Sequence, residues 1–376
     1  MILGGAQEDV LLTVDGLRRS GRYEVGIVSG PETGSEGELL SQARGLGVPV
    51  RIVPELVRAV RPGMDLAALA ALRRLFSELR PDIVQTHSSK AGIVGRLAAR
   101  LARVPVVIHR IHGLAFHPYG RWWRNRLYVA LERAAAPLAD RLVSVSEVVT
   151  RQALAAGVGS PEQYTTIYSG VNVRPYLEAG PKLGRRTRQR YGLGEGDLVI
   201  VKVARLFELK GHEYVLAAAP RVLEALPNAR FLFVGGGPLR ATLERWAADL
   251  LPPGTVRFTG LVPPGDIPGL LAASDILVHA SLREGLPRVF MQAMLAARPV
   301  VSFDVDGAPE IVSPGENGEL IRPGDTGALA RAIVTIGRDA GLRARMGRAG
   351  RERCRETFSA EALLRSTESL YRQLLG

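Results

Sequence analysis

Residues 198–218 read LVIVKVARLFELKGHEYVLAA, and this stretch decides the fold. The run Leu198 to Val203 is short and, apart from one lysine, apolar and β-branched, as expected of a strand in a parallel sheet. A short loop follows, and from about Gly211 the apolar residues recur with helical spacing. A strand that leads directly into a helix is the repeating unit of a parallel sheet covered by helices on both faces.

The same unit recurs on both sides of this stretch. Helical spacing occurs, for example, in Leu66 to Leu79 and Ala91 to Ala102. The alternation runs through the first half of the chain and restarts at Leu198, so we expect an α/β protein with two Rossmann-like domains. The other predicted strands are Tyr23 to Val28, Val48 to Val53, Ile83 to Thr86, Val104 to His109 and Arg141 to Val145, then Arg230 to Val234, Val256 to Thr259, Ile276 to His279, Pro299 to Phe303 and Gly318 to Ile321.

The predicted domain boundary lies in EAGPKLGRRTRQR, residues 178–190, because glycine, proline and clustered positive charge are typical of a linker. The N-terminal domain is then 1–177, joined by a C-terminal helix over 360–376, and the C-terminal domain is 178–359. Met1 to Leu3 is too short for the strand of about five residues that normally precedes the first glycine turn. Either the sequence lacks part of that strand or the sheet has a short strand there.

The composition narrows the class of partner. The single Cys354 excludes a disulfide framework, and no apolar run reaches the roughly 18 residues of a membrane span, so we expect a cytoplasmic protein. The formal net charge of +12 suits anionic ligands or an anionic membrane face. The excess is spread along the chain, unlike the basic stripe of a nucleic-acid binder, so no nucleic-acid partner is expected.

Two glycine turns follow predicted strands, one at Gly4 and Gly5 and one in FVGGGP, which contains Gly235 and Gly236. The backbone N–H groups of such turns can approach a phosphate closely. The alternative is that these glycines only let the chain turn tightly. Neither turn is a full G-x-G-x-x-G, and no acidic residue follows at the expected distance, which disfavours a dehydrogenase.

Arg205 and Lys210 lie in the loop between the strand and the helix of the opening stretch. A planar guanidinium and a compact ammonium together suit a diphosphate whose charge grows as it departs. The alternative is a pair of solvated surface cations.

The stretch REGLPRVFMQAMLAARPV, residues 283–300, places an acid and a glycine before a nearly unbroken apolar helix. The turn from Glu284 to Val289 presents backbone N–H groups at the helix N-terminus, which favours an anion, although an ordinary capped helix is the alternative. Gln292 lies four residues after Arg288, on the same helical face. An unpaired buried amide costs about 1–3 kcal/mol, so Gln292 needs a partner.

Four of the six histidines lie between positions 87 and 117. His109, His112 and His117 match no zinc spacing and no carboxylate or thiolate cluster accompanies them, so no metal site is expected. His112 follows a strand and precedes a glycine, a position suited to hydrogen bonding a substrate. His87 and Lys90 follow another strand and are candidates on the acceptor side, with a merely surface position as the alternative for Lys90.

Residues 119–135, YGRWWRNRLYVALERAA, mix aromatic residues with arginines. One interpretation is a helix that lies on an anionic leaflet, with tryptophans among the headgroups and arginines over phosphates. The alternative is an amphipathic helix that faces the core and has a solvated basic face.

The order of these motifs resembles the retaining, nucleotide-sugar-dependent glycosyltransferases of family 4, which have the GT-B fold. That fold has two Rossmann-like domains whose parallel sheets face a central cleft. The resemblance runs across nearly the whole chain and is specific as a set. The matching stretches are GGAQEDVLLTVDGL, VQTHSSKAGIVGRLAAR, IHGLAFHP, SVSE, VARLFELKGHE, FVGGGP, FTGLV, ASDILVHASLREGLPRVFMQAMLAARPVV and GAPEIV.

The resemblance implies roles for residues of both domains. It implies that Arg205 and Lys210 bind the donor diphosphate, that Glu284 binds hydroxyls of the donor sugar, and that His112 stabilises that sugar near the reacting centre. Gly4 and Gly5 approach the donor from the opposite domain. Most members have a second glutamate for the ribose at the position of Gln292, so weaker donor binding is expected here. The turn residues that add backbone donors are Gly285, Leu286, Pro287, Arg288 and Val289.

The resulting expectation is an enzyme that transfers a sugar from a nucleoside-diphosphate sugar to an acceptor, without a cofactor or metal. A lipid-linked precursor of a cell-surface polysaccharide is the expected acceptor, with peripheral contact at the inner face of the cell membrane. The alternatives are a sugar-nucleotide epimerase or hydrolase on the same fold, and a paralogue that binds a nucleotide sugar without turnover.

Overall fold

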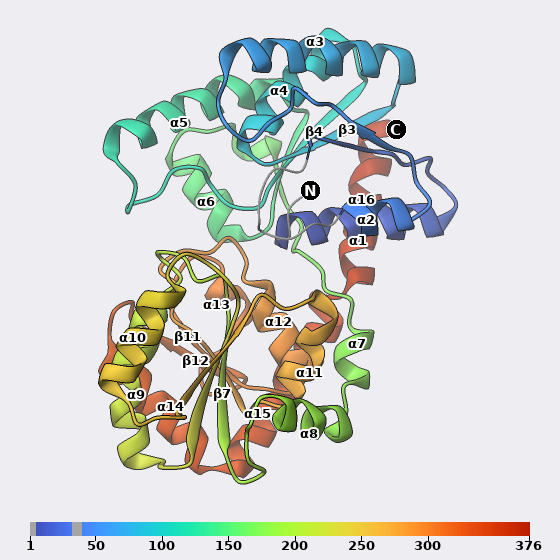
Figure 1. The fold of residues 1–376 in the computed structure, drawn as a ribbon. Helices are drawn as coiled ribbons and strands as arrows, with labels where there is room; N and C mark the ends of the chain where they lie inside the picture. The colour runs from blue at the N-terminus through green and yellow to red at the C-terminus, as the bar shows by residue number, and fades with distance from the viewer. Residues whose placement is uncertain (1–4, 32–39) are drawn as a thin grey trace. The chain divides into compact units, whose positions relative to one another are not determined.

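The computed structural model describes residues 5–31 and 40–376. The chain forms two compact units, Met1–Gly170 with Ala360–Gly376, and Val171–Ser359 (Figure 1). The final helix therefore belongs with the N-terminal unit. The division falls after Gly170, earlier than the boundary at 177 that the linker composition favours, and Val171 pairs with Ser359 where the chain passes into and out of the second unit.

The first unit has short parallel strands joined by helices. Its helices are α1 (Gly5–Ser20), α2 (Leu40–Gly45), α3 (Pro62–Leu79), α4 (Ser89–Leu101), α5 (Trp122–Ala135), α6 (Glu147–Ala155) and α16 (Ala360–Leu375), with 3-10 turns η1 (Ala136–Leu138) and η2 (Pro161–Gln163). Its strands are β1 (Ile27–Ser29), β2 (Val50–Ile52), β3 (Ile83–His87), β4 (Val106–Ile111), β5 (Arg141–Ser144) and β6 (Tyr164–Thr166).

In the described residues these strands form two parallel groups, β1-β2 and β3-β4-β5-β6. The four-stranded sheet is covered on one face by α1 and α16, through Leu17, Leu370 and Tyr371, and on the other by α3 and α4, through Phe76 and Ala98. The short strand β6 has only partly buried residues and was not predicted. The first strand, expected at Met1 to Leu3, and Gly4 lie outside the described residues.

The second unit is a larger parallel α/β domain. Its helices are α7 (Arg174–Glu178), α8 (Pro181–Arg190), α9 (His212–Ala225), α10 (Arg240–Leu250), α11 (Ile267–Ala272), α12 (Arg288–Leu295), α13 (Ala308–Ile311), α14 (Thr326–Arg338) and α15 (Ala340–Thr357), with the turn η3 (Pro264–Asp266). Its strands are β7 (Leu198–Val203), β8 (Ala229–Val234), β9 (Val256–Gly260), β10 (Ile276–His279), β11 (Val300–Phe303) and β12 (Gly318–Ile321).

The strand order of this unit is β12-β11-β10-β7-β8-β9, all parallel. Counted within the unit this is the 3-2-1-4-5-6 order of a Rossmann sheet, and the order in which strands are added reverses between β7 and β10. Helices α9 and α10 cover one face and α11 and α12 the other (Figure 1). The predicted α/β class is confirmed. Ligands of such sheets bind beyond the carboxyl ends of the strands at the reversal point, so the ends of β7 and β10 matter most.

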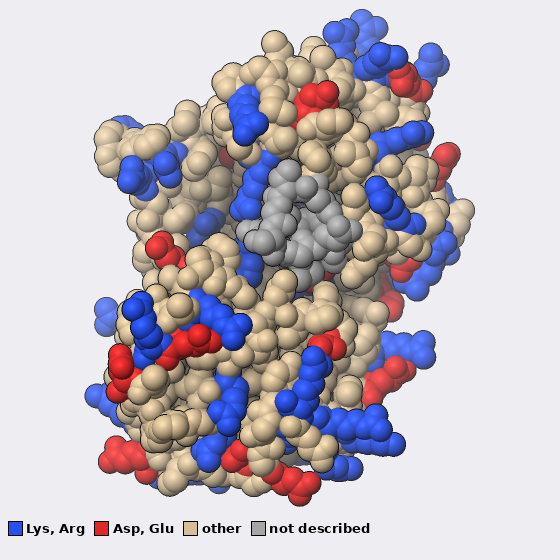
Figure 2. All heavy atoms as spheres, in the orientation of Figure 1, with Lys and Arg blue, Asp and Glu red and all other residues tan. Residues whose placement is uncertain are grey.

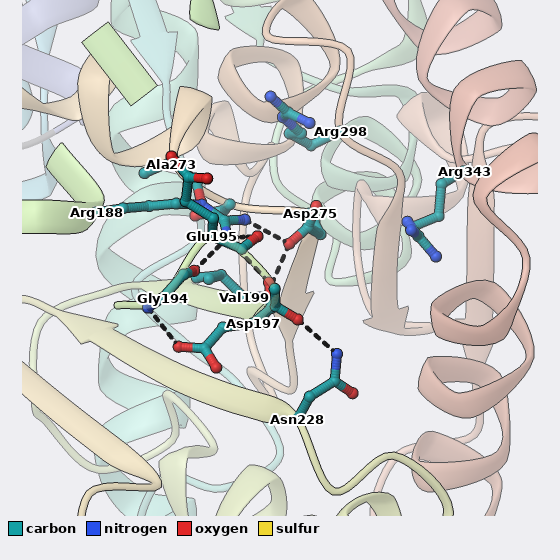
Figure 3. A network of polar contacts seen from close by, with 12 residues as sticks. Arg188, Gly194, Glu195, Asp197, Val199, Asn228, Ala273, Asp275, Arg298 and Arg343 are labelled. Atoms are coloured by element: carbon teal, nitrogen blue, oxygen red, sulfur yellow. Dashed lines mark hydrogen bonds and ion pairs between the residues drawn. The ribbon is translucent and has the colours of Figure 1, made fainter. Parts of the chain in front are cut away.

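The segment expected to be a linker, residues 178–190, is instead mostly helix α8. Proline at its first position suits a helix start, and Arg188 fastens the helix to the second unit. The Arg188 guanidinium donates to Asp275 Oδ2 at 2.8 Å, to Ala273 O at 2.9 Å and to Gly194 O at 2.9 Å (Figure 3). The clustered positive charge therefore helps to anchor a helix, and it does not mark a free connection.

The charged surface agrees with a dispersed basic excess. Lys and Arg side chains are spread over the visible face of both units, among acidic side chains (Figure 2). Within the described residues no helix is long and apolar enough to cross a membrane.

Candidate functional site

The best-defined polar cluster of the second unit lies at the reversal point of its sheet. Lys210 lies in the loop after β7. His279 is the last residue of β10, and Glu284 lies in the loop after that strand. Lys210 Nζ donates to Glu284 Oε1 at 2.7 Å, and His279 Nε2 lies 2.9 Å from the same oxygen. Side-chain exposure is only 25% for Lys210 and 16% for Glu284, so the ion pair is partly shielded from water.

A glycine lets the two loops meet. Gly211 has φ +65°, and a Cβ atom there would lie 1.7 Å from the carbonyl oxygen of Ala280. The loop after β7 can therefore lie directly against the end of β10, which brings Lys210 to Glu284. The opening stretch of the sequence thus needs glycine at this position for packing, whether or not a ligand is bound.

The charges of the cluster support one another. Burial tends to raise the pKa of Glu284, but the charge of Lys210 and hydrogen bonds from His279 and Lys210 outweigh it and hold the pKa well below its ordinary value. Burial lowers the pKa of His279 to about 4, so its ring is neutral near pH 7 and its Nε2–H donates to the carboxylate. Glu284 is therefore a fixed anion and hydrogen-bond acceptor at the sheet edge.

The turn after Glu284 differs in part from the prediction. The backbone N–H of Glu284 donates to Asp306 Oδ2 at 2.6 Å, so it is already satisfied. Helix α12 starts at Arg288, and Pro287 is its N-cap residue. Leu286 and Pro287 are buried, and Gly285 and Val289 are partly exposed. This turn remains next to the ion pair, at an N-terminus that favours negative charge.

Gln292 is not the buried amide that its apolar neighbours suggested. Met291 and Ala293 are buried on either side, whereas Gln292 is partly exposed. Its side chain therefore does not require a protein partner to offset full desolvation. It lies one turn beyond Arg288, on the helical face that begins at the mouth of α12.

Arg205 lies in the same loop after β7 as Lys210 but is exposed. Its guanidinium lies 4.9 Å from the centre of the Phe207 ring. A stacked guanidinium keeps its charge and several of its donors while its conformational freedom is reduced.

The glycine turn after β8 has a clear structural use. Gly235 has φ +144°, and a Cβ there would lie 2.1 Å from the carbonyl oxygen of Ala204. Its N–H donates to Gly260 O at 3.1 Å, and the carbonyl of Gly236 accepts from Leu206 N at 2.9 Å. For Gly235 the structure favours the tight-turn interpretation, because its amide is used within the unit.

Two polar residues of this region, His279 and Lys202, are not among the site residues predicted from the sequence. His279 could have been noticed as the polar end of an apolar strand. Lys202 lies within β7 and is fully buried, and among the described residues its Nζ has no hydrogen-bond partner. Burial lowers the pKa of Lys202 to about 7, opposed by the charge of Glu284. The only sequence feature that indicates this buried lysine is a single charged residue within an apolar strand.

In the first unit, the structure pairs two of the predicted residues. His87, at the end of β3, and His112, just after β4, stack with ring centres 5.3 Å apart. His87 Nδ1 and His112 Nε2 are 2.9 Å apart, a hydrogen bond. Arg110, two residues before His112, forms a buried ion pair with Asp9 of α1 at 2.7 Å. The charges of both residues act on His87.

Lys90 is engaged within its own unit. Its ammonium donates to Val57 O at 2.8 Å and pairs with Asp65 near the start of α3. These contacts tie the loop before α3, and α3 itself, to α4, and the acceptor-side role of Lys90 stays a prediction. Gly5 is the first residue of α1 and Gly4 lies outside the described residues, so the approach of this glycine turn to the donor stays a prediction.

The other histidines of the first unit do not gather around His112 as metal ligands. His109 bonds to the hydroxyl of Thr86 at 2.9 Å, and its ring fills the space that a Cβ on Gly92 would need. Among the described residues, no three His, Cys, Asp or Glu side chains are grouped as a metal site requires.

Helix α5 is the most exposed helix of the first unit that carries large apolar residues. Only Ala135 is buried along it, and Trp122 and Trp123 are 70% and 46% exposed. The alternative of a core-facing helix is therefore disfavoured, because most of the large apolar side chains of α5 are exposed. The exposed aromatic, leucine and arginine side chains are Tyr119, Arg121, Trp122, Trp123, Arg124, Arg126, Leu127, Tyr128, Leu131 and Arg133.

Comparisons with known proteins agree with this arrangement. Residues 185–353 match the family "Glycosyl transferases group 1", and residues 4–170 match "Glycosyl transferase 4-like domain". The chain is 32% identical over 287 residues to UDP-Gal:alpha-D-GlcNAc-diphosphoundecaprenol alpha-1,3-galactosyltransferase of Escherichia coli, covering 76% of this chain and 73% of that protein. It is 30% identical over 326 residues to 2-deoxystreptamine glucosyltransferase of Streptomyces kanamyceticus, covering 84% of each.

Solved structures show the same fold. The Anabaena protein Alr3699/HepE, solved in complex with UDP and glucose, superposes with a TM-score of 0.84 and covers 98% of this chain and 96% of its own, at 24% identity. The glycosyltransferase WaaG, involved in lipopolysaccharide biosynthesis, superposes with a TM-score of 0.75 at 18% identity and covers 97% of this chain and 96% of its own. Together the family matches and the identity to curated relatives show that this chain is an enzyme of the group 1 glycosyltransferases and has the GT-B fold.

Proposed function

We propose that this glycosyltransferase moves a hexose-type sugar from a nucleoside diphosphate to an acceptor and retains the anomeric configuration. The observation that carries the proposal is the cluster of Lys210, Glu284 and His279, with Arg205 on the same sheet edge. It lies at the reversal point of a Rossmann sheet, where nucleotides bind in folds of this kind.

In the proposed reaction an acceptor oxygen forms a bond to the anomeric carbon while the bond from that carbon to the phosphate oxygen breaks. The electron pair of the broken bond stays on the diphosphate. Arg205 and Lys210 stabilise this growing negative charge, aided by the N-terminus of α12. A phosphate oxygen of the donor takes the proton of the acceptor hydroxyl, so the protein needs no general base of its own. We propose that no protein-held metal or cofactor takes part.

Glu284 is assigned to binding rather than to proton transfer. Its lowered pKa keeps it ionised near neutral pH, and one of its oxygens already accepts from Lys210 and His279. An ionised carboxylate held this way is a strong acceptor for sugar hydroxyls. We assign His112 of the first unit to the donor sugar close to the reacting carbon.

A lipid-linked acceptor is proposed, with contact between the protein and the inner face of the cell membrane. Helix α5 supports it, because solvent-exposed tryptophans beside arginines suit the headgroup region of an anionic leaflet. Lys and Arg atoms gather in Figure 2 where α5 lies in Figure 1. The Escherichia coli relative is named for a diphosphoundecaprenol acceptor and the Streptomyces relative for 2-deoxystreptamine, so the proposal for this chain depends on α5.

The amide at position 292 favours weaker binding of the nucleotide sugar. The resemblance to family 4 implies a glutamate for the donor ribose at the position where this chain has Gln292, and an amide forms neutral hydrogen bonds that are weaker than charged ones. We therefore expect modest donor affinity with turnover retained. A protein that binds the nucleotide sugar without turnover is the second candidate.

The test starts with the donor. A panel of UDP-, GDP- and ADP-sugars is screened for thermal stabilisation of the purified protein, because bound ligand raises stability by RT ln(1 + [L]/Kd). The stabilising donor is then incubated with polyprenyl-diphosphate sugar acceptors, and the anomeric configuration of the product is read by NMR. Arg205→Ala should abolish most transfer. Full transfer by this variant, or an inverted product, would overturn the proposal, and donor binding without product would favour the binding-only candidate.

A further inference from the structure

A chain of three hydrogen bonds in the first unit ends at His112. Tyr371 Oη of α16 donates to Gln85 Oε1 at 2.9 Å, and Gln85 Nε2 lies 3.2 Å from His87 Nε2. His87 Nδ1 then lies 2.9 Å from His112 Nε2. The last helix of the chain, strand β3 and the loop after β4 are thereby joined through side chains alone.

The direction of each hydrogen bond follows from its first member. Burial raises the pKa of Tyr371, so its phenol keeps the proton that it donates. Because that proton goes to Gln85 Oε1, the other end of the amide, Nε2, faces His87. An amide nitrogen only donates, so His87 Nε2 must accept and carries no proton.

The two rings then have one consistent arrangement of protons. Burial, with smaller contributions from His112 and Arg110, lowers the pKa of His87 well below its ordinary value, against the opposing charge of Asp9. The ring is therefore neutral near pH 7, and its single proton lies on Nδ1. This N–H donates to His112 Nε2, which leaves the proton of a neutral His112 ring on Nδ1.

We infer that Tyr371, Gln85 and His87 are positioning residues that hold His112 in the tautomer with its proton on Nδ1. The consequence for catalysis rests on the proposed function, in which His112 contacts the donor sugar. In that site the fixed tautomer sets which nitrogen of His112 donates a hydrogen bond and which accepts one before the nucleotide sugar binds. A hydrogen-bonding group that is already oriented needs no reorganisation during the reaction.

The tautomers can be measured without any substrate. Two-bond proton–nitrogen correlations on protein labelled with ¹⁵N-histidine distinguish protonated Nδ1 from protonated Nε2, and single His→Gln variants assign the rings. Near neutral pH we expect both His87 and His112 to be neutral with the proton on Nδ1. Protonation of either ring on Nε2, or a rapidly averaged mixture at His112, would overturn the inference.

Two substitutions on β3 distinguish the effect of losing a hydrogen bond of this chain from the effect of a change in packing. Gln85→Leu removes the donor to His87 Nε2 and should leave both rings as tautomer mixtures. Thr86→Val is the matched control, because Thr86 lies on the opposite face of β3 and bonds to His109, outside the chain. It should leave His87 and His112 unchanged. Equal effects of both variants would contradict the inference, and the wild-type spectrum decides it even if Gln85→Leu does not fold.

Transfer kinetics test the consequence separately. His87→Leu should lower kcat about tenfold with little change in donor KM, since it loses one hydrogen bond that orients His112 beside the reacting carbon. His87→Asn places an amide nitrogen near the position of Nδ1 and should recover most of the loss. If the tautomers are as inferred but His87→Leu transfers at the normal rate, the role of His112 in the proposed function fails and the tautomer assignment stands.

Discussion

Lys210 and Glu284, 74 positions apart in the chain, meet at 2.7 Å where the neighbouring strands β7 and β10 end. The two strands are neighbours because the strand order of the sheet reverses between them. Gly211 lets the loops after these strands touch. The pair therefore joins the phosphate-binding lysine and the sugar-binding glutamate of the proposed site in one electrostatic unit.

Removal of the lysine should affect transfer strongly. Lys210→Gln takes away a charge that stabilises the departing diphosphate and leaves Glu284 without its nearest cation, so kcat/KM should fall about 10²- to 10³-fold. Steady-state transfer with the donor found by thermal screening measures the loss. Lys182→Gln, the same chemical change at an exposed position of α8, should have no effect. Comparable rates for the two variants would exclude a role for Lys210 in transfer.

Gln292→Glu should tighten donor binding about three- to tenfold if Gln292 contacts the ribose, because a charged hydrogen bond replaces a neutral one. Isothermal titration with the donor nucleotide measures the change. Gln189→Glu adds the same charge at an exposed position of the same unit and serves as the control. Unchanged or weaker binding in Gln292→Glu, with the control also unchanged, would separate Gln292 from the ribose site.

Lys202→Met should stabilise the protein, and more so at low pH. Burial lowers the pKa of Lys202 from the ordinary 10.5 to about 7, so between these values the unfolded chain binds more protons and the stability of the wild type rises with pH. Below pH 7 the buried charge is fully present, and its removal should gain on the order of a few kcal/mol.

The advantage of Lys202→Met should shrink as the pH rises through that range. Urea unfolding of both proteins between about pH 6 and pH 10 gives the difference in free energy at each pH. The charges that act on Lys202 are those of Glu284, Lys210 and Glu213, so the wild type must be compared at constant ionic strength. A gain that is the same at every pH would show that packing, and not the buried charge, is responsible.

Substitution of the tryptophans of α5 should weaken membrane binding. Trp122→Ser with Trp123→Ser removes the apolar anchors, and we expect at least about a tenfold loss of binding to vesicles that contain phosphatidylglycerol. Co-sedimentation measures it. Trp246→Ser is the control, because Trp246 is 46% exposed, as Trp123 is, but lies on α10 of the other unit. Equal binding of the double variant and the wild type would remove the support for a membrane role of α5.

Much of the fold was accessible from the sequence. Apolar runs that alternate with helical spacing predicted the strands of the second unit within one residue at each end, because strands buried between two helical layers must be almost wholly apolar. Residues 178–190 are predicted as a linker, but most of them form helix α8. Glycine, proline and arginine are as typical of a helix start with an anchoring guanidinium as they are of a loop, so composition does not distinguish the two. The partly buried β6 has no strong apolar pattern and was missed.

The candidate site was predictable only in part. Arg205, Lys210 and Glu284 stand out as charges in loops that follow strands, and Lys210 and Glu284 each precede a glycine, so the residue types and their places near the strand ends are visible in the sequence. Lys90 looked equivalent, yet it bonds to Val57 O and pairs with Asp65. Whether a cation serves a ligand or holds a loop depends on which acceptors lie within about 3 Å, and sequence spacing does not contain that information.

The sequence by itself therefore determined the strand–helix alternation, the two-domain organisation and the chemical types at the strand ends, because these follow from local periodicity and turn chemistry. Only the tertiary structure decided that Lys210 meets Glu284, that Gln292 is partly exposed, and that Tyr371 reaches Gln85. Each of these depends on the order of strands in a sheet and on helices returning from distant parts of the chain. Such contacts are set by the packing of whole elements, and no short stretch of sequence encodes them.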